Sequence, residues 1–174
     1  MPGFLRETGG NGMAKHLYLI GGPMGVGKTA VGQALKRLLP RCAFLDGDWC
    51  WDADPFQVTG ETKAMVLDNI RHLLGNFLRC GAYDNVVFCW VMDRPEIWDA
   101  VTEGLPLEGC VVHRVVLLCT PETLRSRLEG DIAAGRRTED VLARGLDYLS
   151  RCTRLPFRQI DTTGRSPEET AQLV

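Results

Sequence analysis

A glycine-rich stretch near the N-terminus carries the clearest chemical signal in the chain. An apolar run over residues 17–21 leads into Gly22-Pro-Met-Gly-Val-Gly-Lys-Thr29, and a segment with helical spacing of apolar residues follows. The order strand, G-x-x-x-x-G-K-[ST], helix is typical of a loop that binds nucleotide phosphates. Glycines let the backbone approach the phosphates closely, and the N–H groups of the loop and of the helix N-terminus can face the phosphate oxygens.

This pattern also assigns roles to single side chains. We expect Lys28 to reach the β- and γ-phosphates of ATP and the Thr29 hydroxyl to hold Mg²⁺. The ATP-binding set that we predict here comprises Gly22, Met24, Gly25, Val26, Gly27, Lys28, Thr29 and Ala30. The pattern leaves open how the bound triphosphate is used.

Two acids lie at the end of the next predicted strand, residues 43–46. They form Asp46-Gly-Asp48, at the carboxyl end of that strand, where ligands bind in open α/β sheets. Mg²⁺ prefers one or two carboxylates together with phosphate and water, so we predict Asp46 as a Mg²⁺ ligand. A second carboxylate can orient an attacking hydroxyl and take its proton, which is the role that we predict for Asp48. The alternative is a simple turn in which one acid caps the backbone.

The elements that must position these residues alternate along the chain. We predict strands over residues 17–21, 43–46, 86–91, 111–119 and 157–160, and helices over 28–39, 62–78, 96–103, 121–129, 141–149 and from 166 onward. A glycine-flanked break is expected at residues 130–138. The alternation predicts an α/β fold with three αβα layers, in which helices cover a mostly parallel five-stranded sheet.

Together these motifs resemble the small P-loop kinases. The resemblance rests on the phosphate loop, on Asp46-Gly-Asp48, on a short arginine-bearing insertion before the penultimate helix, and on Asp161-Thr-Thr-Gly-Arg-Ser-Pro-Glu-Glu169. The superfamily includes shikimate, gluconate, adenylylsulfate and nucleoside monophosphate kinases, chloramphenicol phosphotransferase and uncharacterised bacterial nucleotide kinase-like proteins. Phe44-Leu-Asp-Gly-Asp48 is especially similar to the adenylylsulfate kinases. The resemblance covers residues 14–174 and implies a P-loop NTPase fold with a short lid.

The resemblance also implies a lid that supplies positive charge. In nucleoside monophosphate kinases an Arg-x-x-x-Arg run places one arginine over adenine and the next on the phosphates. Here Arg127 keeps the first position, but Asp131 occupies the second. We therefore predict Arg136 and Arg137 as the lid arginines that stabilise charge on the transferring phosphoryl group, without deciding which is the main one. A solvated arginine pair is the alternative.

Two further positions follow from the same resemblance. Gly164 and Arg165 match the loop that flanks adenine in these kinases, mainly through backbone atoms. Asp93 follows the third predicted strand, where a Walker B carboxylate can lie, and its role as a Mg²⁺ ligand stays open.

The acceptor side of the site is expected between Asp48 and Lys63. Trp49, Trp51 and Phe56 supply aromatic surface there, and we predict them, with Asp48, as substrate-binding residues. The segment has no arginine, so its composition favours a neutral or cationic hydroxylated molecule over an anionic one. Tryptophans that simply cover the end of the sheet are the alternative.

These residues predict a Mg²⁺- and ATP-dependent phosphotransferase that acts on a hydroxyl of a small molecule. The predicted catalytic residues are Lys28, Asp48, Arg136 and Arg137. A nucleoside monophosphate kinase is one alternative, although it would need arginines to clamp the acceptor phosphate. A non-catalytic ATP-binding regulatory protein is another.

Composition sets the remaining limits. The 174 residues predict a flexible tail over 1–12 and one domain over 13–174. A net charge of −2 gives no electrostatic reason to bind nucleic acid or an anionic membrane, and no apolar run is long enough to span a bilayer. Seven widely spaced cysteines favour a reducing compartment, so we expect a cytoplasmic protein, either a monomer or a homodimer.

Overall fold

A parallel β-sheet forms the centre of the computed structural model, which describes residues 14–174. The predicted tail, residues 1–12, lies outside the described residues. The strands are β1 (Lys15–Gly21), β2 (Cys42–Asp46), β3 (Asn85–Cys89), β4 (Cys110–Leu118) and β5 (Arg158–Asp161). Their order across the sheet is β2-β3-β1-β4-β5, and every neighbouring pair runs parallel. The predicted strands and the α/β class are confirmed.

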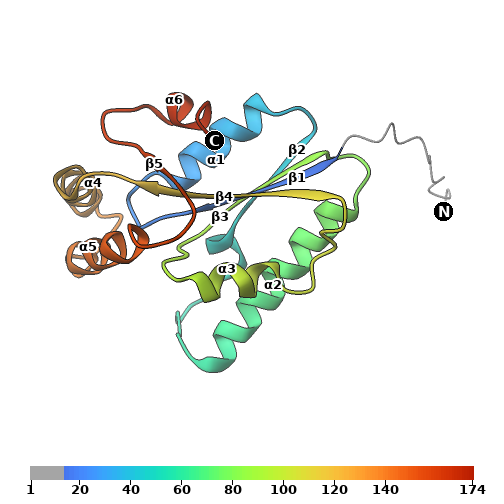
Figure 1. The fold of residues 1–174 in the computed structure, drawn as a ribbon. Coiled ribbons are helices and arrows are strands. Elements are labelled where there is room, and N and C mark those ends of the chain that lie inside the picture. Colours follow the sequence, from blue (N-terminus) through green and yellow to red (C-terminus); the bar gives the residue numbers. More distant parts are fainter. Residues whose placement is uncertain (1–13) are drawn as a thin grey trace.

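Helices cover both faces of this sheet. They are α1 (Lys28–Leu38), α2 (Gly60–Arg79), α3 (Pro95–Thr102), α4 (Pro121–Ala133), α5 (Val141–Cys152) and α6 (Pro167–Ala171), with a 3₁₀ turn, η1, at Gly47–Cys50. Figure 1 shows α1 and α6 on one face, α2 and α3 on the other, and α4 and α5 beside the carboxyl end of β4. In the part of the chain that the structure describes, no helix is both long and apolar enough to cross a membrane.

The central strands are buried on both faces. In β1, Leu17, Leu19 and Ile20 are fully buried, and in β3 so are Val86 and Phe88. Within each strand, alternate positions therefore pack into separate cores. One core, with Ile20 and Val87, lies beneath α1, and the other, with Leu19 and Phe88, lies beneath α2 and α3. This explains why the sequence of both strands is continuously apolar instead of alternating.

Several helix boundaries differ from the prediction, and two of the differences have a local explanation. Helix α2 begins at Gly60 rather than at residue 62, because Thr59 caps it and exchanges reciprocal bonds with Thr62. Helix α4 continues through Gly130 to Ala133, so the predicted break at residues 130–138 is shorter than expected. One glycine inside a helix costs about 1 kcal/mol, which does not end it. The helix ends at Ala133, and Gly135, whose φ of +70° suits glycine, turns the chain after it.

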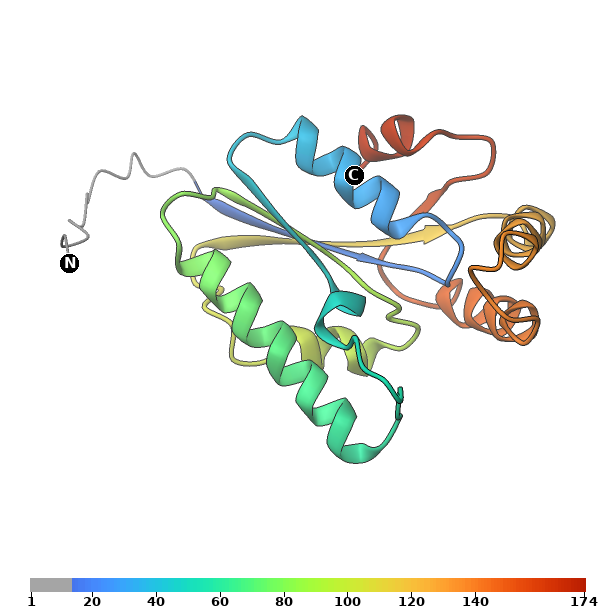
Figure 2. The ribbon, with the colours of Figure 1, turned by 180° about the vertical axis from the view of Figure 1, so that it is seen from behind.

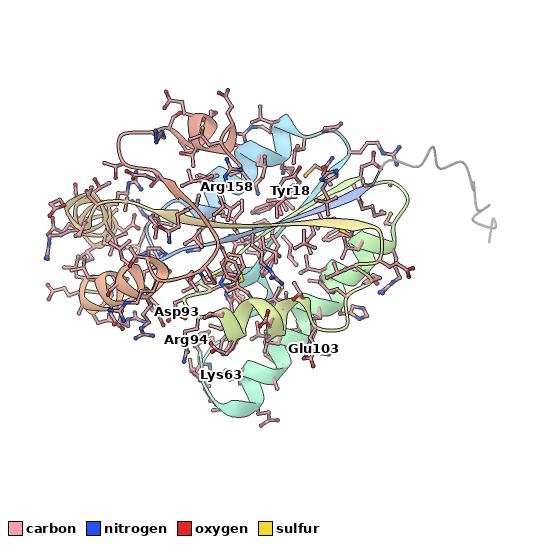
Figure 3. All side chains as sticks on the ribbon, viewed as in Figure 1. Tyr18, Lys63, Asp93, Arg94, Glu103 and Arg158 are labelled. Atoms are coloured by element: carbon pink, nitrogen blue, oxygen red, sulfur yellow. The ribbon has the colours of Figure 1, made fainter. Side chains whose placement is uncertain are left out.

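A histidine pair connects β1 and β4. His16 Nδ1 and His113 Nε2 lie 2.9 Å apart, and the ring of Tyr18 stacks on His113 with 4.3 Å between centroids. Such a hydrogen bond needs an unprotonated nitrogen on one ring. Burial lowers the pKa of His113, and His16 and Arg158 lower it further. Figure 3 shows Tyr18 and Arg158 on the α1 side of the sheet.

This pair makes stability depend on pH. Because the pKa of His113 is lower in the folded chain than its ordinary value of about 6.5, the unfolded chain binds more protons in the window between the two values. The free energy of unfolding should therefore fall as pH drops from about 7.5 to about 5.5. Thermal melts at both pH values should show a smaller drop for His113→Gln than for the wild type. His72→Gln, at an exposed position of α2, should keep the full drop. An unchanged drop in His113→Gln would contradict this assignment.

Candidate active site

The glycine-rich loop joins β1 to α1 at the carboxyl edge of the sheet. Its backbone turns at Gly25 and Gly27, whose φ values of +79° and +105° are accessible mainly to glycine. A Cβ atom at Gly25 would also come within 2.6 Å of the Leu128 side chain from α4. The loop therefore has its shape because glycine stands at these two positions, and it ends at the N-terminus of α1.

Lys28, the first residue of α1, folds back across this loop. Its Nζ donates a hydrogen bond to the Pro23 carbonyl over 2.8 Å. Burial lowers the pKa of the Lys28 ammonium, and the carboxylates of Asp48 and Asp46 act in the opposite direction. The sequence therefore places a desolvated cation beside two acids at the phosphate loop, where it can meet phosphate oxygens.

Thr29 and Asp46 form an oxygen pair next to Lys28. The Thr29 hydroxyl donates to Asp46 Oδ2 over 2.6 Å, and the backbone N–H of Asp48 donates to Asp46 Oδ1 over 3.0 Å. Asp46 is the last residue of β2 and is 5% exposed. A hydroxyl and a carboxylate in contact at a phosphate loop are hard oxygen donors of the kind that Mg²⁺ prefers. These residues therefore fit a magnesium ion.

Asp48 follows on the 3₁₀ turn η1. Burial raises the pKa of its carboxyl group and the neighbouring Asp46 raises it further, while Lys28, Trp90 and Arg137 lower it. Trp90 also fixes the turn, because a Cβ atom at Gly47 would come within 2.4 Å of its indole ring. The surroundings of Asp48 thus raise the pKa of its carboxyl group above the ordinary value of an aspartate.

A cavity of about 680 Å³ collects most of the predicted residues. Its donor-side wall includes Met24, Gly25, Gly27, Lys28, Thr29 and Ala30, and Asp46, Asp48, Trp51, Phe56 and Arg137 also line it. Figure 2 shows the elements that surround this end of the sheet: η1, the segment after it, α4 and α5. The volume suits a small-molecule site.

A smaller cavity of about 240 Å³ lies on the other side of the phosphate loop. It is lined by Val26, Arg127, Thr162 and Arg165, among others. The Arg127 guanidinium is held by bonds of 3.0 Å to the Val26 carbonyl, 3.0 Å to Thr162 Oγ1 and 3.1 Å to the Thr162 carbonyl. Gly164 turns the chain before Arg165 with a φ of +66° but does not line the cavity. Arg127 and Arg165 therefore both border a space beside the phosphate loop.

Comparison with known families decides what this architecture is. A family model described as an AAA domain matches residues 19–144, which is more than half of the chain. The chain belongs to the AAA domain family. No match was found among curated protein sequences.

Solved structures place this AAA domain among the small P-loop kinases in fold. The tunicamycin resistance protein of Deinococcus radiodurans is 20% identical with a TM-score of 0.68, and 91% of this chain and 92% of that chain align. A gluconokinase from Sinorhizobium meliloti 1021 is 18% identical with a TM-score of 0.65, and the alignment covers 90% of this chain and 87% of that chain. A shikimate kinase from Acinetobacter baumannii, in complex with shikimate, is 21% identical with a TM-score of 0.56, and the alignment covers 92% of this chain and 90% of that chain. The predicted resemblance and the kinase-like P-loop NTPase fold are confirmed.

The two predicted lid arginines of the AAA domain share one carboxylate. Arg136 Nη2 lies 2.8 Å from Asp131 Oδ1, and Arg137 Nε lies 3.2 Å from Asp131 Oδ2. These bonds hold the pKa of Asp131 below its ordinary value, with Arg136 the largest cause. Arg137 and Asp131 line the large cavity, whereas Arg136 does not. Asp131 occupies the position of the second arginine of the Arg-x-x-x-Arg run, and it forms ion pairs with both Arg136 and Arg137.

Trp51 and Trp49 lie in different places. Trp51 lines the cavity and packs on Phe56, with 4.9 Å between ring centroids. Trp49 is 59% exposed, lies edge-on to Phe44 and is not part of the cavity wall. The 3₁₀ turn of η1 separates them, because two positions on such a turn point in different directions. The structure thus brings Trp51 and Phe56 to the site and leaves Trp49 outside it.

Asp93 lies in an ion pair instead of the cavity wall. It is 3% exposed, and its Oδ2 accepts from Arg151 Nη1 over 2.7 Å, while Arg94 Nε lies 3.6 Å from Oδ1. Figure 3 shows Asp93 and Arg94 at the start of α3. The buried carboxylate therefore joins the end of β3 to α5.

Two cavity residues of α5 were missed by sequence reasoning. Arg144 and Tyr148 line the large cavity and stand four positions apart, so they share one face of the helix. The spacing of Arg144 and Tyr148 was the only sign in the sequence that they share a helix face. It did not predict a binding site, because the polar face of most helices is exposed to solvent.

Proposed function

We propose that this AAA domain protein is a Mg²⁺-dependent phosphotransferase that moves the γ-phosphate of ATP to a hydroxyl of a small molecule. One observation carries the proposal: Asp48 lines the same cavity as Lys28, Thr29 and Asp46. A basic carboxylate beside a phosphate-binding loop and a magnesium-type oxygen pair has the composition of a phosphoryl-transfer site.

Each side chain has a distinct task in this mechanism. Asp48 accepts a hydrogen bond from the acceptor hydroxyl and takes its proton late in the transfer, a role that its raised pKa favours. Lys28 and Arg137 neutralise the charge that develops on the transferring phosphoryl oxygens. Thr29 and Asp46 would hold Mg²⁺, which would offset negative charge on the phosphates when bound.

The names of the structural neighbours support a small acceptor. Gluconokinase and shikimate kinase are named for small hydroxylated molecules, and the shikimate kinase is in complex with shikimate. On the acceptor side of the cavity wall, this chain has Trp51 and Phe56. The support therefore extends to the reaction class and to a small-molecule acceptor.

Coupled measurement of ADP release tests the proposal. The full chain is assayed with Mg²⁺ and ATP against panels of sugars, other alcohols, nucleosides and nucleoside monophosphates. At least one neutral hydroxyl acceptor should stimulate ADP release, and Asp48→Asn should lower the stimulated rate about 100-fold. ATP affinity should change little, because Asp48 is assigned to the acceptor.

Asp52→Asn is the matched control, since Asp52 is an exposed acid on the same segment and does not line the cavity. It should keep the wild-type rate. Stimulation by nucleoside monophosphates alone would replace the proposal by a nucleoside monophosphate kinase. No stimulation by any acceptor would favour an ATP-binding regulatory protein.

A further inference from the structure

We infer that the acceptor is a hydroxylated molecule without negative charge that presents a flat apolar ring to the cavity. The inference rests on the proposed phosphotransfer and adds the substrate class. Two features of the acceptor side carry it: an aromatic wall formed by Trp51 and Phe56, and a balance of charge among the ionisable side chains.

The aromatic wall consists of two rings in contact, and part of its surface is exposed to the cavity. Trp51 and Phe56 pack on each other at an interplanar angle of 47°, and both line the large cavity. Phe56 is nevertheless 58% exposed, so much of its ring surface faces the cavity and solvent. A ring of the acceptor that covers this surface gains both apolar burial and the geometric preference of aromatic pairs.

The ionisable groups of the cavity wall balance one another. Three are cationic, Lys28, Arg137 and Arg144, and three are acidic, Asp46, Asp48 and Asp131. Bound ATP with one Mg²⁺ adds net negative charge to this neutral set. A carboxylate or phosphate on the acceptor would then enter a cavity of its own sign, which raises the cost of binding.

Both arginines of the cavity wall already have carboxylate partners. Arg137 Nε lies 3.2 Å from Asp131, and Arg144 Nη2 lies 2.7 Å from Asp140. To bind an anionic acceptor, these arginines would have to exchange their carboxylate partners for it. The exchange would add little binding free energy. A neutral or cationic acceptor requires no exchange.

Four matched probes separate the two features. They are phenyl β-D-glucoside, phenyl β-D-glucuronide, methyl β-D-glucoside and methyl β-D-glucuronide, which differ in the ring, in the carboxylate, or in both. Binding to the full chain, loaded with Mg²⁺ and a non-hydrolysable ATP analogue, is measured by ligand-observed NMR titration. Phenyl glucoside should bind about tenfold more tightly than phenyl glucuronide or methyl glucoside, and the difference from methyl glucuronide should be larger.

Three variants assign these preferences to residues. Phe56→Ala should remove the tenfold advantage of the phenyl group, while Val58→Ala, equally exposed at 58% and outside the cavity wall, should keep it. Asp131→Asn releases Arg136 and Arg137 and should strengthen binding of phenyl glucuronide about tenfold.

Four results would overturn the inference. The first two are tighter binding of either glucuronide than of its glucoside and no binding of any probe. The other two are loss of the phenyl preference in Val58→Ala and survival of that preference in Phe56→Ala. Since these titrations involve no turnover, they are independent of the ADP-release assay. A phenyl preference in a protein that releases no ADP with any acceptor would refute the phosphotransferase and leave the ligand class standing.

Discussion

A Lys28→Met variant is expected to lose about 10³-fold in acceptor-stimulated ATP turnover. The Lys28 ammonium is the cation that α1 places at the phosphate loop, 2.8 Å from the Pro23 carbonyl and close to Asp46 and Asp48. Methionine is an unbranched side chain one atom shorter than lysine, so it keeps most of the packing and removes the charge that should stabilise the transferring phosphoryl group. Coupled ADP release with a responsive acceptor measures the loss.

The same variant should not lose stability. Burial lowers the pKa of Lys28, so the folded chain bears a cost for keeping this ammonium charged that the unfolded chain does not bear. Removing the charge removes that cost, and the Tm of Lys28→Met should equal or exceed the wild-type value. Such a trade between stability and activity is common at functional sites. A variant that turns over normally, or one that is inactive only because it melts early, would contradict the role given to Lys28.

The donor half of the site could be predicted from sequence because its residues are local. The phosphate loop requires glycine at Gly25 and Gly27 for backbone reasons, and Lys28 and Thr29 follow on the next turn. Asp46 was placed correctly at the edge of the sheet because a strand end fixes it, and its contact with Thr29 follows from parallel topology. Short-range geometry and one crossover connection are enough for this half.

The acceptor half depends on packing that no local pattern records. Arg144 and Tyr148 reach the cavity because α5 lies beside the carboxyl end of the sheet, a position set by long-range contacts such as Arg151 with Asp93. Trp49 and Trp51 look equivalent in sequence, but only Trp51 enters the cavity wall. The fold was predictable from periodicity, and this part of the cavity wall was not, because it is assembled from segments far apart in the chain.

Trp98→Ala is expected to lower the free energy of unfolding by about 3–5 kcal/mol. Trp98, on α3, is fully buried, and its indole N–H donates to the Met92 carbonyl over 3.0 Å. It packs on Phe157 with 4.6 Å between ring centroids, and a Cβ atom at Gly21 would come within 2.3 Å of it. Truncation therefore leaves a large cavity and an unpaired carbonyl directly beneath the end of β1.

Trp49→Ala is the matched control for this loss, because Trp49 is 59% exposed and should cost less than about 0.5 kcal/mol. Urea unfolding of both variants and the wild type measures the difference, and similar m-values would show that the same cooperative unit unfolds. Equal losses in the two variants would mean that Trp98 does not support the core as described. A large loss in Trp98→Ala alone would tie the stability of the domain to the residue that packs against Gly21, the last residue before the phosphate loop. The indole that requires glycine at that position would then be shown to stabilise the core beneath the base of the candidate active site.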